Sequence, residues 1–149
     1  MMYNYIMAKL VLDLHDIYNK GKQIDTELNR IIDDAVNKKI KLLYPYKKDS
    51  YNFRMWKKYY SGASGLMGLK IKSKNTNSVK KFVNSLKLFG YGYSWGGFES
   101  LALHQEYRET GNRKYLNLAK DEHLVRLHIG LEDPSDLIAD IKQALKHLK

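Results

Sequence analysis

The sequence contains no cysteine. Disulfide bonds and metal sites built from thiolates are therefore excluded, and a reducing compartment is allowed. No apolar run approaches the roughly 20 residues that a membrane-spanning helix needs. Near the N-terminus, Lys9 and Asp13 interrupt a short apolar run, and no small-residue cleavage site follows it. This segment therefore does not have the pattern of a secretory signal peptide.

Acidic residues are too few to balance the basic ones, and the formal net charge is +10. A charge of this size raises nucleic acid as a candidate partner. However, most of the excess comes from scattered lysines, whereas arginine, the better base-reading side chain, is scarce. We interpret the charge as a solvated lysine surface, and nucleic-acid binding remains the less favoured alternative.

The basic stretch from Tyr46 to Tyr60 also contains aromatic residues, including Trp56 and Tyr59. Aromatic rings interleaved with basic groups can form a stacking platform for single-stranded nucleic acid. The alternative is a surface loop and short helix whose rings cover the edge of the core. We favour the alternative, because aromatic side chains usually pack.

The first part of the chain has helical spacing of its apolar residues. Lys20-Gly21-Lys22 predicts a break, and Asp25 is expected to cap a second helix. We therefore divide the chain into an unassigned helical leader, residues 1–24, and one domain, residues 25–149. At 149 residues with 44% apolar content, the chain is long enough to bury a single core.

Alternating apolar and polar residues predict strands over residues 39–42, 66–72 and 124–130. The second follows a glycine-containing turn that lacks the Gly-Lys-Ser/Thr ending of a nucleotide-binding loop. Between the strands, Ser78 is expected to cap a helix that runs to about Leu88. This order of strands and helices predicts an α+β fold in which helices cover one face of a small sheet.

Two further segments complete the prediction. The segment from Leu101 to Glu122 is expected to begin as a helix and then become polar. The last helix has Asp133 as its cap and Pro134 at its first position, which is a typical helix start.

Four side chains between the strands were considered as metal ligands, but their spacing matches no recognised site. Packed or solvated histidines are the favoured interpretation. These residues are His104, Glu106, Glu109 and His123.

The densest motif is Tyr93-Ser94-Trp95-Gly96-Gly97-Phe98-Glu99-Ser100. Glycine occurs where the backbone needs positive φ or where another group approaches closely, and such a turn can present N–H groups to an anion. About thirty residues later, the strand 124–130 is expected to direct Arg126 and His128 away from the core. An arginine on an otherwise apolar strand favours an anionic partner held by a bidentate guanidinium. The two motifs together predict one carboxylate-binding pocket, with a hydrogen-bonded structural role as the default for His128.

Both motifs resemble the C-terminal domain of the cystathionine β-lyases, members of the pyridoxal phosphate (PLP)-dependent trans-sulfuration family. The resemblance extends through Asp136-Leu137-Ile138-Ala139-Asp140 and back to Ser61-Gly62-Ala63-Ser64-Gly65-Leu66, and it covers roughly residues 40–149. It implies the C-terminal fold of fold-type I PLP enzymes, a small and mainly antiparallel sheet covered by helices. It also implies cystathionine as substrate, with homocysteine, pyruvate and ammonia as products, and a role in methionine biosynthesis in the cytoplasm.

By position, Arg126 matches the family's arginine for the substrate α-carboxylate, and Ser94 and Trp95 match the residues beside it. Trp95 favours the β-lyase branch, because related γ-acting enzymes usually have leucine there. No catalytic, cofactor-binding or metal-binding residue is assigned in this chain. The family's PLP-binding domain has no counterpart here: the sequence has no Ser-X-Thr-Lys motif for the cofactor lysine. PLP is therefore not expected to bind this chain alone, and the chain alone is not expected to be an active lyase.

Three alternatives remain open at this point. The chain is an inactive piece of a split gene, or it works with a separately encoded PLP-domain chain, or it is a basic binding module that kept only the fold. Self-association through the surface that would meet a PLP domain is also expected.

Overall fold

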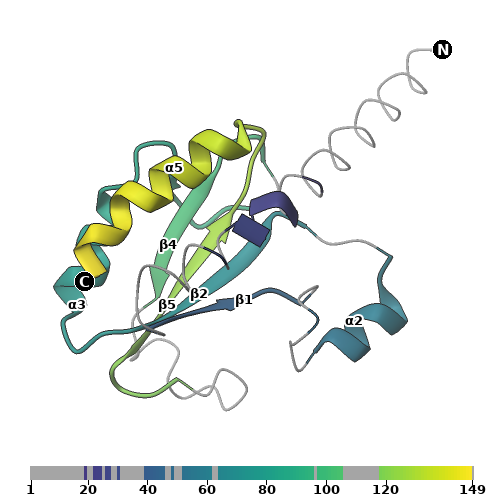
Figure 1. Cartoon of the computed structure of the whole chain (residues 1–149), viewed down its shortest axis with the longest axis horizontal. Helices are drawn as coiled ribbons and strands as arrows, with labels where there is room; N and C mark the ends of the chain where they lie inside the picture. The colour runs from purple at the N-terminus through teal and green to yellow at the C-terminus, as the bar shows by residue number, and fades with distance from the viewer. Residues whose placement is uncertain are drawn as a thin grey trace.

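The computed structural model shows an α+β domain in which one mixed sheet carries helices on one face. Figure 1 shows helices α3 (Thr76–Asn84) and α5 (Pro134–Ala144) over the sheet, whereas α2 (Phe53–Tyr59) lies outside these two layers. A short 3-10 turn, η1 (Leu145–Leu148), ends the described chain. The residues described are 19, 22–24, 26, 27, 30, 39–45, 48, 52–61, 64–95, 97–105 and 118–148.

The sheet has five strands in the order β1-β2-β5-β4-β3. Three of the four pairings are antiparallel, and only β3 runs parallel to β4, so the sheet is mainly antiparallel as expected. The long central strands β2 and β5 pair along their whole length. The strands are β1 (Ile40–Leu43), β2 (Leu66–Lys72), β3 (Gly90–Tyr91), β4 (Leu101–Gln105) and β5 (Glu122–His128).

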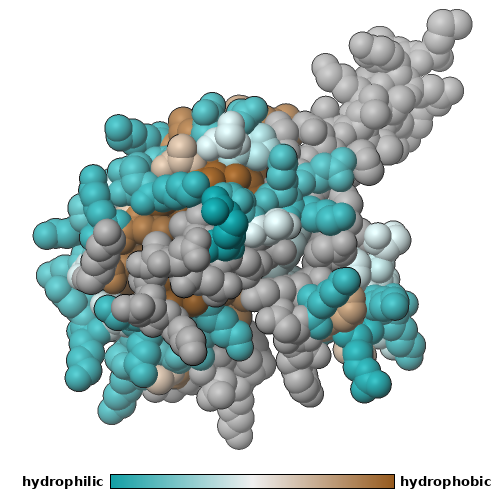
Figure 2. Space-filling model, viewed as in Figure 1, coloured by the Kyte–Doolittle hydropathy of each residue, from teal (hydrophilic) through white to brown (hydrophobic). Residues whose placement is uncertain are grey.

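The core lies between the sheet and helices α3 and α5. Met67, Leu69 and Ile71 of β2 are buried, and Lys70 and Lys72 point to the other face, which confirms the predicted alternation. Val79, Phe82 and Val83 of α3 are also buried. The outer surface is covered largely by hydrophilic side chains on the face drawn in Figure 2. No helix in the described part of the chain is long and apolar enough to cross a membrane.

Two predicted helix boundaries were wrong. Helix α3 is capped by Asn75, whose side chain accepts a hydrogen bond from the amide of Asn77, so Ser78 lies inside the helix rather than at its cap. The segment beginning at Leu101 is strand β4, not a helix. Its apolar residues fit either structure, but β4 completes the hydrogen bonding of β5, which would otherwise be an open edge.

Helix α5 begins as predicted, with Asp133 accepting a hydrogen bond from the amide of Ser135 and Pro134 in the first turn. Asp140 of this helix is buried and accepts hydrogen bonds from the amides of Lys87 and Leu88, at 2.8–3.0 Å. It therefore ties α5 to the turn after α3.

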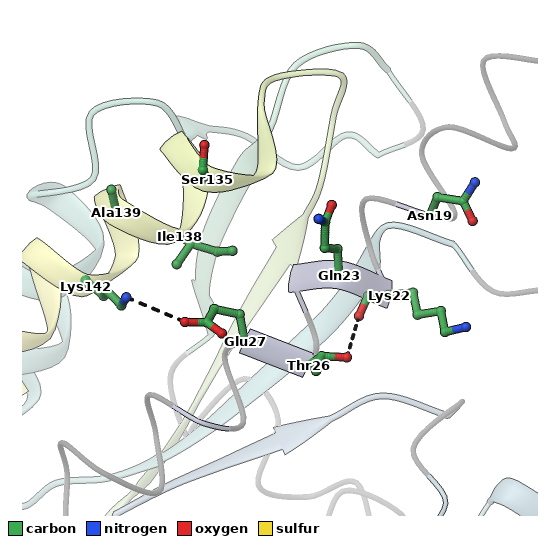
Figure 3. Close-up of a pocket in the computed structure, with 9 residues that line it drawn as sticks. All are labelled: Asn19, Lys22, Gln23, Thr26, Glu27, Ser135, Ile138, Ala139 and Lys142. Atoms are coloured by element: carbon green, nitrogen blue, oxygen red, sulfur yellow. Dashed lines mark hydrogen bonds and ion pairs between the residues drawn. The ribbon is translucent and has the colours of Figure 1, made fainter.

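Part of the segment before β1 faces α5, with Glu27 directed towards Lys142 (Figure 3). The predicted break does not fall at Lys22, because Lys22 to Ile24 are helical. Ile24 is fully buried in the main core, and Glu27 pairs with Lys142 at 3.6 Å across a shallow groove. Asp25, the predicted cap, lies outside the described residues.

Candidate functional site: an arginine beneath an aromatic loop

Strand β5 separates core residues from site residues. Val125, Leu127 and Ile129 have no exposed surface, whereas Arg126 faces the side of the sheet away from the helices. The predicted division of this strand into two faces is confirmed. In the ladder Arg126 lies opposite Gly68 of β2 and Leu103 of β4, so it stands in the middle of the sheet.

The loop between β3 and β4, residues 92–100, brings the second motif to this arginine. Because β3 and β4 are parallel, the chain must return along the sheet between them, and this loop makes the return. The Nη2 group of Arg126 donates to the carbonyl oxygens of Gly92 and Ser94, at 2.9 and 3.1 Å. The Arg126 Cζ lies 5.6 Å from the centre of the Trp95 ring, within cation–π range. The structure therefore brings Arg126, Ser94 and Trp95 together.

The contacts of Arg126 use only part of its guanidinium. Its Nε and Nη1 groups have no hydrogen-bond partner in the described part of the chain, and no described carboxylate is paired with it. A guanidinium held at one nitrogen still offers donors for an incoming anion, and the neighbouring indole face restricts its orientation. This arrangement can bind a carboxylate without first breaking an internal ion pair.

The segment that carries Trp95 exposes an aromatic rim of four large apolar side chains. The side chain of Trp95 is 65% exposed although it stacks on Arg126, and Ser94 is also exposed. Four large apolar side chains gathered on one short segment are unusual for a free surface. The other three members of this rim are Tyr91, Tyr93 and Phe98, each about two-thirds exposed or more.

His128 holds the loop through a hydrogen bond to its backbone. It is buried, and its Nε2 lies 3.1 Å from the carbonyl oxygen of Gly97. A carbonyl only accepts, so Nε2 carries the proton and donates. The default structural role of His128 is thus confirmed.

The glycines of the site behave differently from the prediction. Gly96 lies outside the described residues. At Gly97 an added Cβ would meet nothing within 4 Å, and its φ lies outside the left-handed region, so neither expected reason for glycine holds there. Gly130 is the constrained position, because an added Cβ would lie 2.2 Å from the carbonyl oxygen of Phe98.

The clasp formed by Glu132, Ser100 and Gly130 was not anticipated from the sequence. Glu132 accepts hydrogen bonds from the amide and the hydroxyl of Ser100, and Ser100 Oγ in turn accepts from the amide of Gly130. In the sequence, Ser100 is a serine directly before a strand and Glu132 is an acidic residue just after another strand. This pattern is too common in proteins to indicate a contact between the two residues.

The histidines considered as ligands form a pair rather than a metal site. His104 Nε2 and His123 Nδ1 are 3.1 Å apart, and His123 Nε2 lies 3.1 Å from the carbonyl oxygen of Ser73. Among the described residues, no group of three or more potential ligands gathers around a common point. Glu106 and Glu109 lie outside the described residues.

The donor set at Arg126 fits an anion such as a carboxylate, and it does not include the groups that hold the reactive part of PLP. In the described structure the groups that contact this arginine are two carbonyl oxygens and an indole ring. PLP-dependent enzymes use a lysine amine for the Schiff base and a charged partner for the pyridinium nitrogen. Neither kind of group contacts Arg126 among these residues.

Comparisons with known proteins identify the family. A model described as Cys/Met metabolism PLP-dependent enzyme matches residues 33–146. A cystathionine beta-lyase of Bordetella avium is 41% identical over 106 residues, which are 71% of this chain and 26% of that protein. An L-alanine/L-glutamate racemase of Wolbachia pipientis is 36% identical over 109 residues, 72% of this chain and 27% of that protein.

The fold agrees with this. The crystal structure of cystathionine gamma-lyase from Lactobacillus plantarum superposes with a TM-score of 0.71 at 20% identity, covering 93% of this chain and 35% of that one. The chain thus spans about a quarter of the length of the sequence relatives that it matches. It belongs to the family of PLP-dependent enzymes of cysteine and methionine metabolism.

Proposed function

We propose that this chain provides the substrate-carboxylate site of a cystathionine β-lyase, a carbon–sulfur lyase, and that these 149 residues are inactive by themselves. The observation that carries the proposal is the partly engaged guanidinium of Arg126 beneath the loop of Ser94 and Trp95. The similarity to a cystathionine beta-lyase supports the choice of reaction. Trp95 supports the β-lyase branch.

In this proposal Arg126 binds the α-carboxylate of the amino-acid substrate. Its bonds to Gly92 and Ser94 hold the guanidinium in place before the substrate arrives, which lowers the entropy lost on binding. A bidentate contact fixes the position of the neighbouring Cα, and catalysis at Cα depends on that position. Trp95 covers one side of the guanidinium and excludes water from it.

The cofactor would be supplied by a PLP domain outside these 149 residues, as a separately encoded chain. When bound, PLP supplies an electron sink for proton movements at Cα. The aromatic rim (Tyr91, Tyr93, Trp95 and Phe98) is the surface that we propose meets this partner, because burying the rim would remove its apolar area from water. In the absence of the partner the same rim would support self-association.

The test is to mix the purified chain with any PLP domain found encoded near its gene, add PLP and cystathionine, and measure pyruvate. The two-chain form predicts pyruvate and the visible absorbance of lysine-bound PLP in the mixture only. Arg126→Gln should keep the absorbance but lose pyruvate, whereas Glu99→Gln, a nearby exposed acid, should change neither. Absorbance and pyruvate from the chain alone would contradict the proposal. If the two chains assemble but show neither the absorbance of lysine-bound PLP nor pyruvate, the chain is an inactive fragment.

A second candidate function is favoured by the surface of α2. Tyr59 and Tyr60 are 60% and 67% exposed, contrary to the expectation that these rings cover the core, although Trp56 is partly buried and stacks on Phe53. Lys58 lies 5.0 Å from the centre of the Tyr59 ring. Such a surface could stack single-stranded nucleic acid. Binding of single-stranded nucleic acid that weakens steeply with rising salt concentration would support this second function. An absence of such binding at low salt would refute it.

We also propose a cytoplasmic location, which the absence of cysteine permits. Fractionation of cells that express the tagged chain would test this.

A further inference from the structure

Glu132 closes the loop that carries Ser94 and Trp95. Its Oε1 accepts from the amide of Ser100 at 2.8 Å, and its Oε2 accepts from the hydroxyl of Ser100 at 2.7 Å. The same hydroxyl oxygen accepts from the amide of Gly130 at 2.9 Å, and Ser100 is only 1% exposed. The carboxylate thus fixes the end of the loop against the chain that follows β5.

This clasp is one of three places where the loop is anchored. Arg126 holds the loop at Gly92 and Ser94, and His128 holds it at Gly97. Arg126 and His128 are two residues apart on β5 and face the same way, and Glu132 follows in the bend after β5. The loop is therefore held at its beginning by Arg126 and at its end by Glu132.

The two ends have different chemistry. At the beginning, the loop is held by the guanidinium that would also bind the substrate carboxylate. The anion would bind the remaining donors, Nε and Nη1, of the same guanidinium whose Nη2 holds the loop, so an anchor independent of Arg126 helps to keep the loop in place when the anion binds. Hydrogen bonds to an ionised carboxylate are stronger than those between neutral groups, so the clasp can hold the loop while Arg126 is engaged.

We propose that Glu132 is a positioning residue for carboxylate binding, acting through Ser100 on the loop that places Ser94 and Trp95 beside Arg126. This inference rests on the proposed carboxylate site. Glu132 does not touch the substrate. Glu132 raises the fraction of molecules in which the loop holds Ser94 and Trp95 in the position that binds the carboxylate. The apparent affinity for the carboxylate rises in proportion to that fraction.

The experiment measures binding of L-cystathionine to the 149-residue chain in a Trp56→Phe background, with Trp95 fluorescence as the signal. Glu132→Ala should raise the apparent dissociation constant about tenfold. Glu132→Gln keeps an acceptor for the Ser100 amide and should give an intermediate value. The control is Glu99→Ala, which removes the same charge from the exposed part of the loop and should bind like the parent.

A second measurement separates positioning from loss of stability. Backbone 15N relaxation of Ser94 and Trp95 should show increased motion in the Glu132 variants under conditions where denaturation curves show the chain fully folded. A role in stability alone would lower the denaturation midpoint and leave both affinity and loop motion unchanged. If Glu132→Ala does not fold, the same comparison is made with Glu132→Gln.

The outcomes distinguish this inference from the proposed function. Folded Glu132 variants that bind as tightly as the parent, with an equally rigid loop, would overturn the positioning role. If the parent chain itself does not bind L-cystathionine while the loop loosens in the Glu132 variants, the carboxylate site fails but the effect of Glu132 on the loop stands.

Discussion

Replacing Gly130 by alanine tests whether the aromatic loop really approaches β5 as closely as the structure shows. The new Cβ would lie 2.2 Å from the carbonyl oxygen of Phe98 and 2.6 Å from the carbonyl carbon of Glu99. Non-bonded carbon and oxygen atoms normally stay about 3.3 Å apart or more. Since both obstructing atoms belong to the backbone, no rotamer change relieves the overlap, and the loop must move away.

The cost follows from the hydrogen bonds at this contact. The amide of Leu131 donates to the carbonyl of Phe98 at 2.8 Å, and the amide of Gly130 donates to Ser100 Oγ at 2.9 Å. Losing two neutral bonds costs about 2 kcal/mol, and opening the charged contacts of Glu132 would add up to about 3 kcal/mol. Alanine restricts the unfolded chain and returns about 0.4 to 1 kcal/mol. The expected loss in free energy of unfolding is therefore about 1 to 5 kcal/mol.

Gly97→Ala is the matched control in the same loop. An added Cβ there meets nothing within 4 Å and φ lies outside the left-handed region, so this variant should be unchanged or stabilised by up to about 1 kcal/mol. Urea denaturation followed by tryptophan fluorescence measures both variants against the parent chain. If Gly130→Ala were as stable as Gly97→Ala, the close contact between the loop and β5 would be wrong.

Three further predictions follow from other parts of the structure. Asp140→Ala removes the acceptor of the part-buried hydrogen bonds from the Lys87 and Leu88 amides and should lower the free energy of unfolding by about 2 to 4 kcal/mol, with Asp140→Asn losing less; equal losses would contradict the role of its charge. Burial would raise the pKa of Glu122, but hydrogen bonds from the Ala119 amide and Lys70 lower it below its ordinary value of 4.5. A carboxyl group whose pKa is lower in the folded than in the unfolded chain stabilises the fold at pH values above its unfolded pKa, and this stabilisation is lost as the pH falls through its folded pKa. Glu122→Gln should therefore flatten the decline in stability below about pH 5, and an unchanged decline would refute this. Phe98→Ser should reduce self-association in sedimentation velocity at high concentration, and association equal to that of the parent would exclude the aromatic rim as the contact.

The parts of this fold that sequence patterns predicted are those that depend on local spacing. The alternation in β2 and β5 assigned Met67, Leu69 and Val125 to the core, since a strand buries every second residue. The start of α5 was equally accessible, because Asp133 caps a helix through an amide only two residues away. Local rules of this kind do not require knowledge of the neighbouring strands.

The parts that escaped prediction depend on partners far away in the chain. The segment Leu101–Gln105 is a strand because β5 lies beside it, and its own sequence does not decide between strand and helix. The clasp joins Ser100 to Glu132 across 32 residues, and Asp140 reaches Lys87 across 53. For the site itself, the sequence indicated that Arg126 faces away from the core, but the carbonyl oxygens that hold it belong to the loop backbone and carry no signature in the side chains.

The most direct test of the carboxylate site is an NMR titration of the Arg126 side-chain Nε–H signal with L-cystathionine. The structure predicts a saturable shift, because Nε and Nη1 have no hydrogen-bond partner among the described residues and can donate to the incoming carboxylate. An amino acid with a different side chain should give the same shift. Esterifying both α-carboxylates of L-cystathionine should abolish it. A signal that does not move, or that moves equally with the ester, would contradict the claim that Arg126 binds the substrate carboxylate.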